Sequence, residues 1–185
     1  MAHADRAVGS GLGGAGAGGA GAGGGGGPRQ AMARHALLPL RIFLGVTFVY
    51  AGLDKLTDPA FFASGGTGSV GELMRQVRDT SAVPALVDLA LKNPAGFGYA
   101  IAAGELAVGI GTLVGLFARV AAFGGALISL SLWLTVSWST QPYYYGNDLA
   151  YLMAWLPLVL AGAPMLSLDA ALAARRSRQG RQLFG

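Results

Sequence analysis

Cysteine is absent from this chain of 185 residues, and histidine is almost absent. Without cysteine the chain has no disulfide, no thiolate nucleophile and no iron–sulfur ligand set. The two histidines, His3 and His35, both precede the long apolar stretches. They therefore cannot hold a haem between membrane helices, and neither a metal site nor a Ser/His/Asp triad is expected.

Charge is also scarce, because only 12% of the residues are charged whereas 53% are hydrophobic, and the mean hydropathy is +0.51. Soluble domains carry about 25% charged residues. Disordered chains are poor in apolar residues, so disorder throughout the chain is excluded. The composition therefore indicates a membrane protein.

Four apolar stretches account for this composition, and each is close to the about 20 residues that cross the hydrocarbon core as a helix. They lack the alternation of barrel strands, so they are expected to be helices. The sequence predicts an all-α integral membrane protein, a four-helix bundle. The predicted spans cover residues 38–56, 97–117, 120–138 and 149–166.

The chain divides into three parts by composition. Glycine and alanine dominate residues 9–27, which predicts a disordered tail over residues 1–29 that lacks the apolar core of a signal peptide. The four-helix domain is expected at residues 37–169. Residues 170–185 are expected to form a basic cytoplasmic tail that can contact anionic lipid headgroups.

The basic residues lie mostly on one side of the predicted spans, which sets the orientation. By the positive-inside rule both termini are expected in the cytoplasm, with the chain in the cell inner membrane. Since topology accounts for the arginines, no nucleic-acid partner is expected. Nine of the 13 basic residues are on this side: Arg6, Arg29, Arg34, Arg41, Arg119, Arg175, Arg176, Arg178 and Arg181.

The long loop between the first two spans is expected to contain two short interfacial helices. Ser69 and Glu72 have the spacing of a capping box, which predicts a helix through about Arg78. A second amphipathic helix is predicted from Pro84 to Lys92. We expect these helices to cap the bundle; a lid over a substrate is the alternative.

The first span carries a narrow stripe of residues at helical spacing: Arg41, Gly45, Phe48, Gly52 and Lys55. Arg41 lies near the cytoplasmic end and is expected to extend to the headgroups. Lys55 could do the same at the outer end. Because it shares the stripe with two glycines, which are typical of helix contacts, it could instead point into the bundle and be functional.

Glu105 is the acidic residue deepest within a predicted span, about 12 Å from the outer boundary. A carboxylate in hydrocarbon is costly, so it should face the bundle interior and be paired or protonated. We interpret Glu105 as functional. A structural ion pair with Lys55 is the alternative.

Aromatic residues cluster near the outer side of the last two spans. Trp133, Trp138 and Tyr143 to Tyr145 are typical of an interfacial belt, although aromatic residues can also line a slot for a flat ring. Asn147 and Asp148 suit the N-cap of the fourth span. Tyr151 and Trp155 lie one turn apart on the same face of that span.

Several of these residues together resemble the DoxX/DoxD family. The resemblance rests on Arg41 to Gly45, Gly52 to Leu56, the pair Gly104 and Glu105, and Ser167 to Asp169. It covers about residues 37–169. The long outer loop is more similar to the DoxD branch, the small subunit of thiosulfate:quinone oxidoreductase.

The resemblance implies a quinone-linked membrane redox subunit that passes electrons from thiosulfate or another outer-side donor to quinone, usually with a second subunit. We hypothesise that Glu105 relays protons, that Lys55 stabilises reduced oxygen, and that Tyr151 and Trp155 contact the quinone ring. Two alternatives are a non-catalytic subunit or scaffold for a partner redox or stress protein, and a small transporter. The chain could also form a homo-oligomer.

Overall fold

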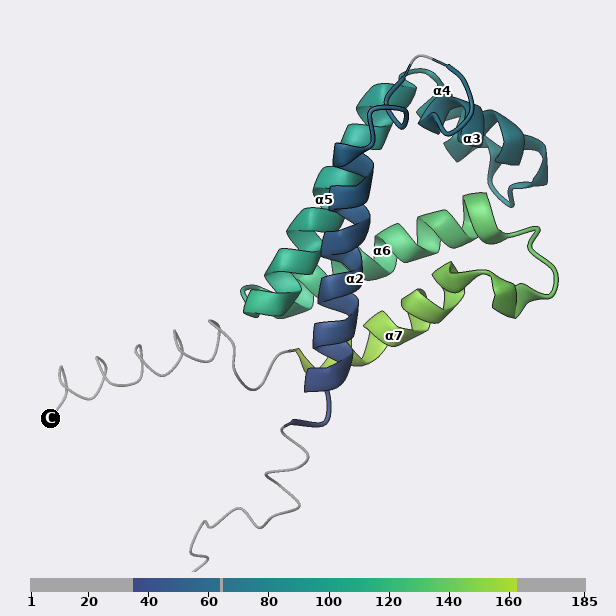
Figure 1. Cartoon of the computed structure of the whole chain (residues 1–185). Coiled ribbons are helices and arrows are strands. Elements are labelled where there is room, and N and C mark those ends of the chain that lie inside the picture. The colour runs from purple at the N-terminus through teal and green to yellow at the C-terminus, as the bar shows by residue number, and fades with distance from the viewer. Residues whose placement is uncertain (1–34, 64, 163–185) are drawn as a thin grey trace, which may run out of the picture.

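The structure is a computed structural model that describes residues 35–63 and 65–162. In these residues the regular secondary structure is entirely helical (Figure 1). The predicted tails at residues 1–29 and 170–185, and the close at Ser167 to Asp169, lie outside the described residues. The all-α prediction is therefore confirmed for the part of the chain that the structure describes.

Helix α2 (Leu38–Thr57) lies along α5 (Pro94–Val114), and glycines allow the close approach (Figure 1). A Cβ atom on Gly109 would lie 2.7 Å from the backbone nitrogen of Val49 and 2.9 Å from the carbonyl oxygen of Gly45. A Cβ atom on Gly52 would lie 2.8 Å from the carbonyl oxygen of Ala102. The backbones of the two helices are thus in contact, and the glycine stripe of α2 faces a neighbouring helix as predicted.

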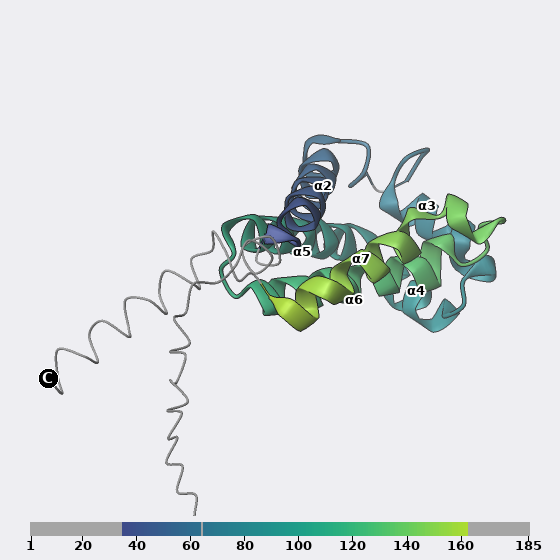
Figure 2. The ribbon, with the colours of Figure 1, turned by 90° about the horizontal axis from the view of Figure 1, so that it is seen from below.

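Helix α6 (Ala118–Leu132) continues through the π-helical turn η2 (Trp133–Ser137), and a short 3₁₀ turn, η3 (Tyr143–Tyr145), leads to α7 (Asn147–Ala161). Helices α6 and α7 lie side by side and cross the α2–α5 pair (Figures 1 and 2). The central core lies between the two pairs and contains Leu44, Phe48, Val108, Ala122, Ala126, Trp155 and Leu158.

The outer loop folds into α3 (Val70–Val77), the 3₁₀ turn η1 (Arg78–Thr80) and α4 (Pro84–Leu91), which confirms the two predicted short helices. The hydroxyl of Ser69 accepts a hydrogen bond from the backbone nitrogen of Glu72, as the capping box predicts. The Glu72 carboxylate instead accepts hydrogen bonds from Arg75 and Gln76. A second core of Val70, Met74, Val87 and Ala90 joins the two helices.

A hydrogen-bonded junction ties this loop to η2. The carbonyl oxygen of Leu134 accepts hydrogen bonds from the backbone nitrogen of Ala82, at 2.9 Å, and from the hydroxyl of Ser81, at 3.2 Å. A π-helical turn interrupts the regular α-helical bonding pattern and is common at functional sites. The junction holds the residues that follow η1 against η2, at the end of α6.

Within residues 35–63 and 65–162, two helices are long and apolar enough to cross a membrane: α5, and α6 together with η2. Helix α7 is apolar but shorter, with 15 described residues. Helix α2 is long enough but carries three charged residues, Arg41, Asp54 and Lys55. Large apolar side chains such as Tyr50, Val120 and Leu160 are exposed on the outside of the helices. The structure therefore shows a helical chain with two membrane-capable helices, whereas the four spans stay a prediction.

The prediction that Arg41 extends to the headgroups was wrong. The side chain is buried, and its Nη2 atom donates a hydrogen bond of 2.8 Å to the carbonyl oxygen of Leu113. That carbonyl belongs to the last turn of α5, where carbonyls have no partner within the helix. Arg41 therefore supplies a hydrogen-bond donor to a carbonyl at the end of α5, and this bond holds α2 against α5 there.

Candidate functional site

Lys55 of α2 and Glu105 of α5 form a buried ion pair. The Nζ atom of Lys55 lies 2.8 Å from Oε2 and 3.0 Å from Oε1 of Glu105. The Glu105 side chain is 4% exposed and that of Lys55 is 23% exposed. Both side chains therefore point into the interior, and they meet as the ion-pair alternative predicts.

The helix contact explains why these two side chains meet. Gly52 lies almost one turn before Lys55, and its missing side chain brings α2 against Ala102 and Leu106 of α5. Glu105 lies on the same face of α5, between these two contact residues. The Nζ atom also donates a 3.3 Å hydrogen bond to the carbonyl oxygen of Ala51. The ammonium group thus donates to three oxygen atoms, all of them within the protein.

Asp148 lies near the Lys55–Glu105 ion pair, and the sequence did not indicate this. We expected Asn147 or Asp148 to cap α7, but the N-cap is Gly146 and neither side chain caps the helix. The carboxylate of Asp148 instead accepts a hydrogen bond from the hydroxyl of Ser137, at the end of η2. It also interacts electrostatically with Lys55 and Glu105. The N-cap prediction was wrong because the turn before α7 places Asp148 toward the interior.

A small polar cavity of about 160 Å³ adjoins the ion pair. Helices α2, α5, α6 and α7 each contribute to its wall. Ser129 lines this cavity and is only 1% exposed, and its hydroxyl has no hydrogen-bond partner among the described residues. The lining residues that carry polar side chains are Thr47, Lys55, Glu105, Ser129, Asp148 and Tyr151.

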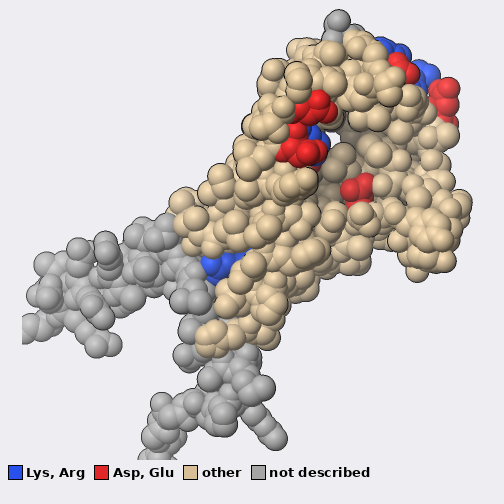
Figure 3. All heavy atoms as spheres, viewed as in Figure 1, with Lys and Arg blue, Asp and Glu red and all other residues tan. Residues whose placement is uncertain are grey.

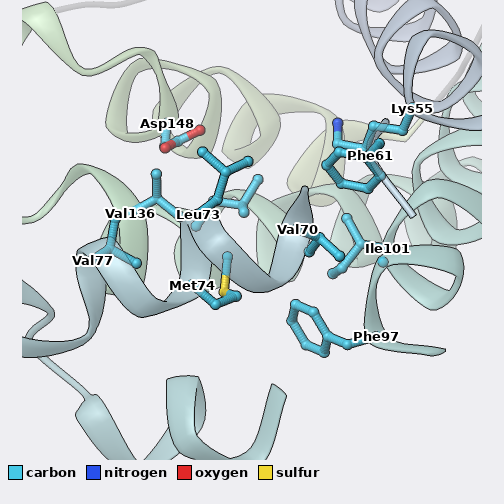
Figure 4. Close-up of a pocket in the computed structure, with 12 residues that line it drawn as sticks. Lys55, Phe61, Val70, Leu73, Met74, Val77, Phe97, Ile101, Val136 and Asp148 are labelled. Carbon is cyan, nitrogen blue, oxygen red and sulfur yellow. The ribbon is translucent and has the colours of Figure 1, made fainter. Parts of the chain in front are cut away.

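A second, apolar cavity of about 260 Å³ lies between α3 and the long helices. Figure 4 shows Leu73 and Met74 of α3 on its wall, with Lys55 and Asp148 on opposite sides. Lys55, Leu132 and Asp148 line both cavities, so the apolar and polar cavities meet at these residues. The outer surface is hollowed in this region, with acidic and basic side chains at the edge of the hollow (Figure 3).

The two predicted ring-contacting aromatic residues differ in position. Tyr151 lines the polar cavity and lies edge-on to Phe48, with ring centroids 6.2 Å apart. Trp155 is fully buried in the core, edge-on to Phe48 at 5.0 Å and packed on Gly125. Trp155 lines neither the polar nor the apolar cavity. Trp155 therefore supports the wall of the site through Phe48.

The exposed aromatic residues line neither of the two cavities. Trp138 and Tyr143 to Tyr145 are between 47% and 70% exposed, and successive tyrosine rings contact one another edge-on. Trp133 contacts Trp138 at 5.3 Å between ring centroids. This exposed position is compatible with the predicted interfacial belt.

The geometry defines a helical, membrane-capable protein with a buried ion pair beside two joined cavities. A family model, DoxX, matches residues 36–138, more than half of the chain, and the chain belongs to the DoxX family of membrane-associated proteins. The matched range includes Lys55 and Glu105 and ends before Asp148, Tyr151 and Trp155. The searches of curated proteins and of solved structures returned no match.

Proposed function

We propose that this chain is a quinone-linked redox subunit of a cell inner membrane, embedded in lipid as a four-helix bundle with both termini in the cytoplasm. The observation that carries the proposal is the Lys55–Glu105 pair at the junction of an apolar and a polar cavity. Buried ionisable groups within membrane helices are costly and are typically found where protons, ions or ligands are handled.

The residues present fit a quinone ring. The apolar cavity is lined by flat or branched apolar side chains, which suit an aromatic ring with alkyl substituents, and its polar residues, Lys55 and Asp148, also line the polar cavity. These two residues would hold the oxygen-bearing part of the ring. Tyr151 would contact the ring from the polar cavity.

Bound quinone supplies an acceptor for two electrons and two protons. Thiosulfate or another outer-side donor, acting through a second subunit, would supply the electrons, because this chain's own residues form no redox centre. Glu105 would transfer protons from the polar cavity, and Lys55 would stabilise negative charge on an oxygen atom. Tyr151 would orient the ring for this transfer.

Quinone content tests the proposal directly. The full-length protein would be purified from its membranes in a mild detergent, and the extracted lipids would be analysed by mass spectrometry. We expect quinone to co-purify with the wild type and with the exposed-site control Asp54→Asn, and to be depleted from Tyr151→Ala, which removes the proposed ring contact. Quinone-free wild type, or equal quinone in all three proteins, would overturn the proposal.

A non-catalytic scaffold is the second candidate, and one observation favours it. Lys55 already donates to Glu105 and to Ala51, so the ion pair can serve solely to align α2 with α5. In that case Glu105→Gln would reduce assembly with a partner protein and leave any quinone reduction by the assembled fraction unchanged. Co-purification of the partner, measured alongside quinone, separates the two functions.

A further inference from the structure

The outer loop forms a small body of its own beside the apolar cavity. The guanidinium of Arg78, in η1, donates hydrogen bonds to the carboxylate of Asp88, in α4. Because these contacts lie within the loop, α3, η1 and α4 can move together without losing them. The core that joins α3 to α4 consists of Val70, Met74, Val87 and Ala90.

Helix α3 covers one side of the cavity. Four of its apolar residues line the cavity: Val70, Leu73, Met74 and Val77. Val70 is 3% exposed and Met74 is 8% exposed, so little solvent reaches this face of α3. The facing wall includes Ile101 of α5, which lies across the cavity from α3 (Figure 4). Moving α3 away from the long helices would therefore open the cavity.

The two chain connections of this body lie side by side at one end. A Cβ atom on Gly71, near the start of α3, would lie 3.4 Å from the Cβ atom of Pro94, the first residue of α5. The backbone nitrogen of Val70 donates a 2.8 Å hydrogen bond to the carbonyl oxygen of Phe61. Just before α3, Gly68 has a φ angle of 89° and open space around its Cβ position. Adjacent attachments and an unpacked connection are the features of a hinge.

The far end of the body is held by one acceptor. The backbone nitrogen of Ala82 and the hydroxyl of Ser81 both donate to the carbonyl oxygen of Leu134, in η2. This carbonyl lies in the last turn of its helix, where carbonyls lack helical partners. The same turn contacts the site, because the hydroxyl of Ser137 donates to Asp148. Two such hydrogen bonds can break locally while the buried helices stay packed.

We propose that α3, η1 and α4 are a lid over the apolar cavity, hinged beside Pro94 and latched on the carbonyl oxygen of Leu134. Release of the latch tilts the lid away from η2 and admits a molecule with an apolar body, which suits the apolar wall. Closure returns Leu73 and Met74 to their places on that wall. The lid does not depend on the identity of this molecule, so its absence would leave the proposed redox function intact.

A thiol inside the cavity reports opening of the lid. The chain has no cysteine, so Ile101→Cys would be its single thiol. Its reaction with a charged, water-soluble methanethiosulfonate would be timed on the full-length protein in lipid nanodiscs. Ala82→Pro removes the latch N–H, and Ser81 already has the extended backbone that precedes proline, with φ −69° and ψ 144°. We expect the reaction to become about three- to tenfold faster, the equilibrium effect of one hydrogen bond.

Three further variants test whether the lid moves as one body from its latch. Val87→Cys places the thiol in the core between α3 and α4, away from the cavity, and its reaction should stay slow with or without Ala82→Pro. Ser81→Ala removes the other latch donor and should speed the Ile101→Cys reaction as Ala82→Pro does. Asp79→Asn, an exposed neighbour of the latch, should leave that rate unchanged.

The outcomes are distinct. An unchanged Ile101→Cys rate in a folded Ala82→Pro protein overturns the lid. Equal acceleration at Val87→Cys shows that the loop unfolds rather than tilts, which overturns it as well. Where Ala82→Pro does not fold, hydrogen exchange of the wild type decides. The amide of Ala82 should exchange faster than that of Val70, because the latch opens while the hinge stays bonded, and equal exchange at both contradicts the lid.

Discussion

Lys55 and Glu105, fifty residues apart in the chain, join α2 to α5 through two hydrogen bonds from one ammonium group. The pair is positioned by the backbone contact at Gly52, less than one turn away on α2. Removing one partner of a buried ion pair leaves the other charge unpaired in a low-dielectric interior. The pair should therefore matter more to stability than the exposed ion pairs of the outer loop.

A double-mutant cycle tests this relationship. Lys55→Met and Glu105→Leu should each lower the free energy of unfolding by about 3 kcal/mol, the low end of the range for buried pairs, because the Lys55 side chain is partly exposed. The double variant should lose much less than the sum. The same cycle on the exposed pair Glu72 and Arg75 should show coupling below about 1 kcal/mol. Additive losses at Lys55 and Glu105 would show that the pair has no mutual interaction.

The contact between α2 and α5 predicts a strong position effect for small substitutions. Gly109→Ala should destabilise the protein by about 1–3 kcal/mol, because its methyl group would meet the backbone atoms of Val49 and Gly45. Gly104→Ala, on the face toward α6, should be tolerated, since the nearest atom is a side-chain methyl of Ile128 at 3.4 Å. Thermal denaturation in detergent compares the two, and equal melting temperatures would contradict the packing.

The outer loop should loosen in acid through one ion pair. The guanidinium of Arg78 holds the pKa of Asp88 below its ordinary value of 3.8, through a hydrogen bond and charge attraction. A lowered pKa in the folded state means that ionised Asp88 stabilises the fold above pH 3.8, and that this contribution disappears as the pH falls through the lowered pKa. Hydrogen exchange of the α4 amides should therefore speed up in acid.

Asp88→Asn supplies the control for this acid effect. The variant lacks the titrating carboxylate, so hydrogen exchange of its α4 amides should no longer show the increase in acid that depends on Asp88. If the wild type and the variant show the same acid dependence, another group controls the loop. Because both side chains of the pair are exposed, the effect should be confined to α3, η1 and α4 rather than to the buried helices.

The proposed membrane orientation predicts a labelling pattern. The chain has no cysteine, so single cysteines can be introduced at exposed positions without background. Asp79→Cys, in the outer loop, should react with a membrane-impermeant maleimide in intact cells, whereas Leu116→Cys, in the turn between α5 and α6, should react only after permeabilisation. Reaction of both cysteines from the same side would contradict the orientation.

The sequence was sufficient for features that depend on helical spacing. The 3.6-residue repeat placed Gly45, Gly52 and Lys55 on one face of the first helix, and the cost of a buried carboxylate turned Glu105 inward. The structure places both charges accordingly. The outer helices followed from local signals, the Ser69 cap and the prolines at Pro84 and Pro94.

Features that depend on tertiary contacts were not predictable in this way. Arg41 bonds to a carbonyl 72 residues away, and spacing on its own helix gives no indication of that partner. Asp148 has the sequence position of a helix cap, but the π-helical turn brings Ser137 within hydrogen-bond reach. An acidic residue at the start of an apolar helix was the available signal, and capping accounted for it equally well.

If Glu105 transfers protons to a bound quinone, as proposed, the rate of quinone reduction depends on its carboxyl group. The protein would be assembled in liposomes with the proposed second subunit and supplied with thiosulfate as electron donor, and compared with Glu105→Gln and Asp54→Asn at equal assembly. We expect a loss of about a hundredfold in Glu105→Gln and an unchanged rate in Asp54→Asn. A fully assembled Glu105→Gln protein that reduces quinone at the wild-type rate would contradict it.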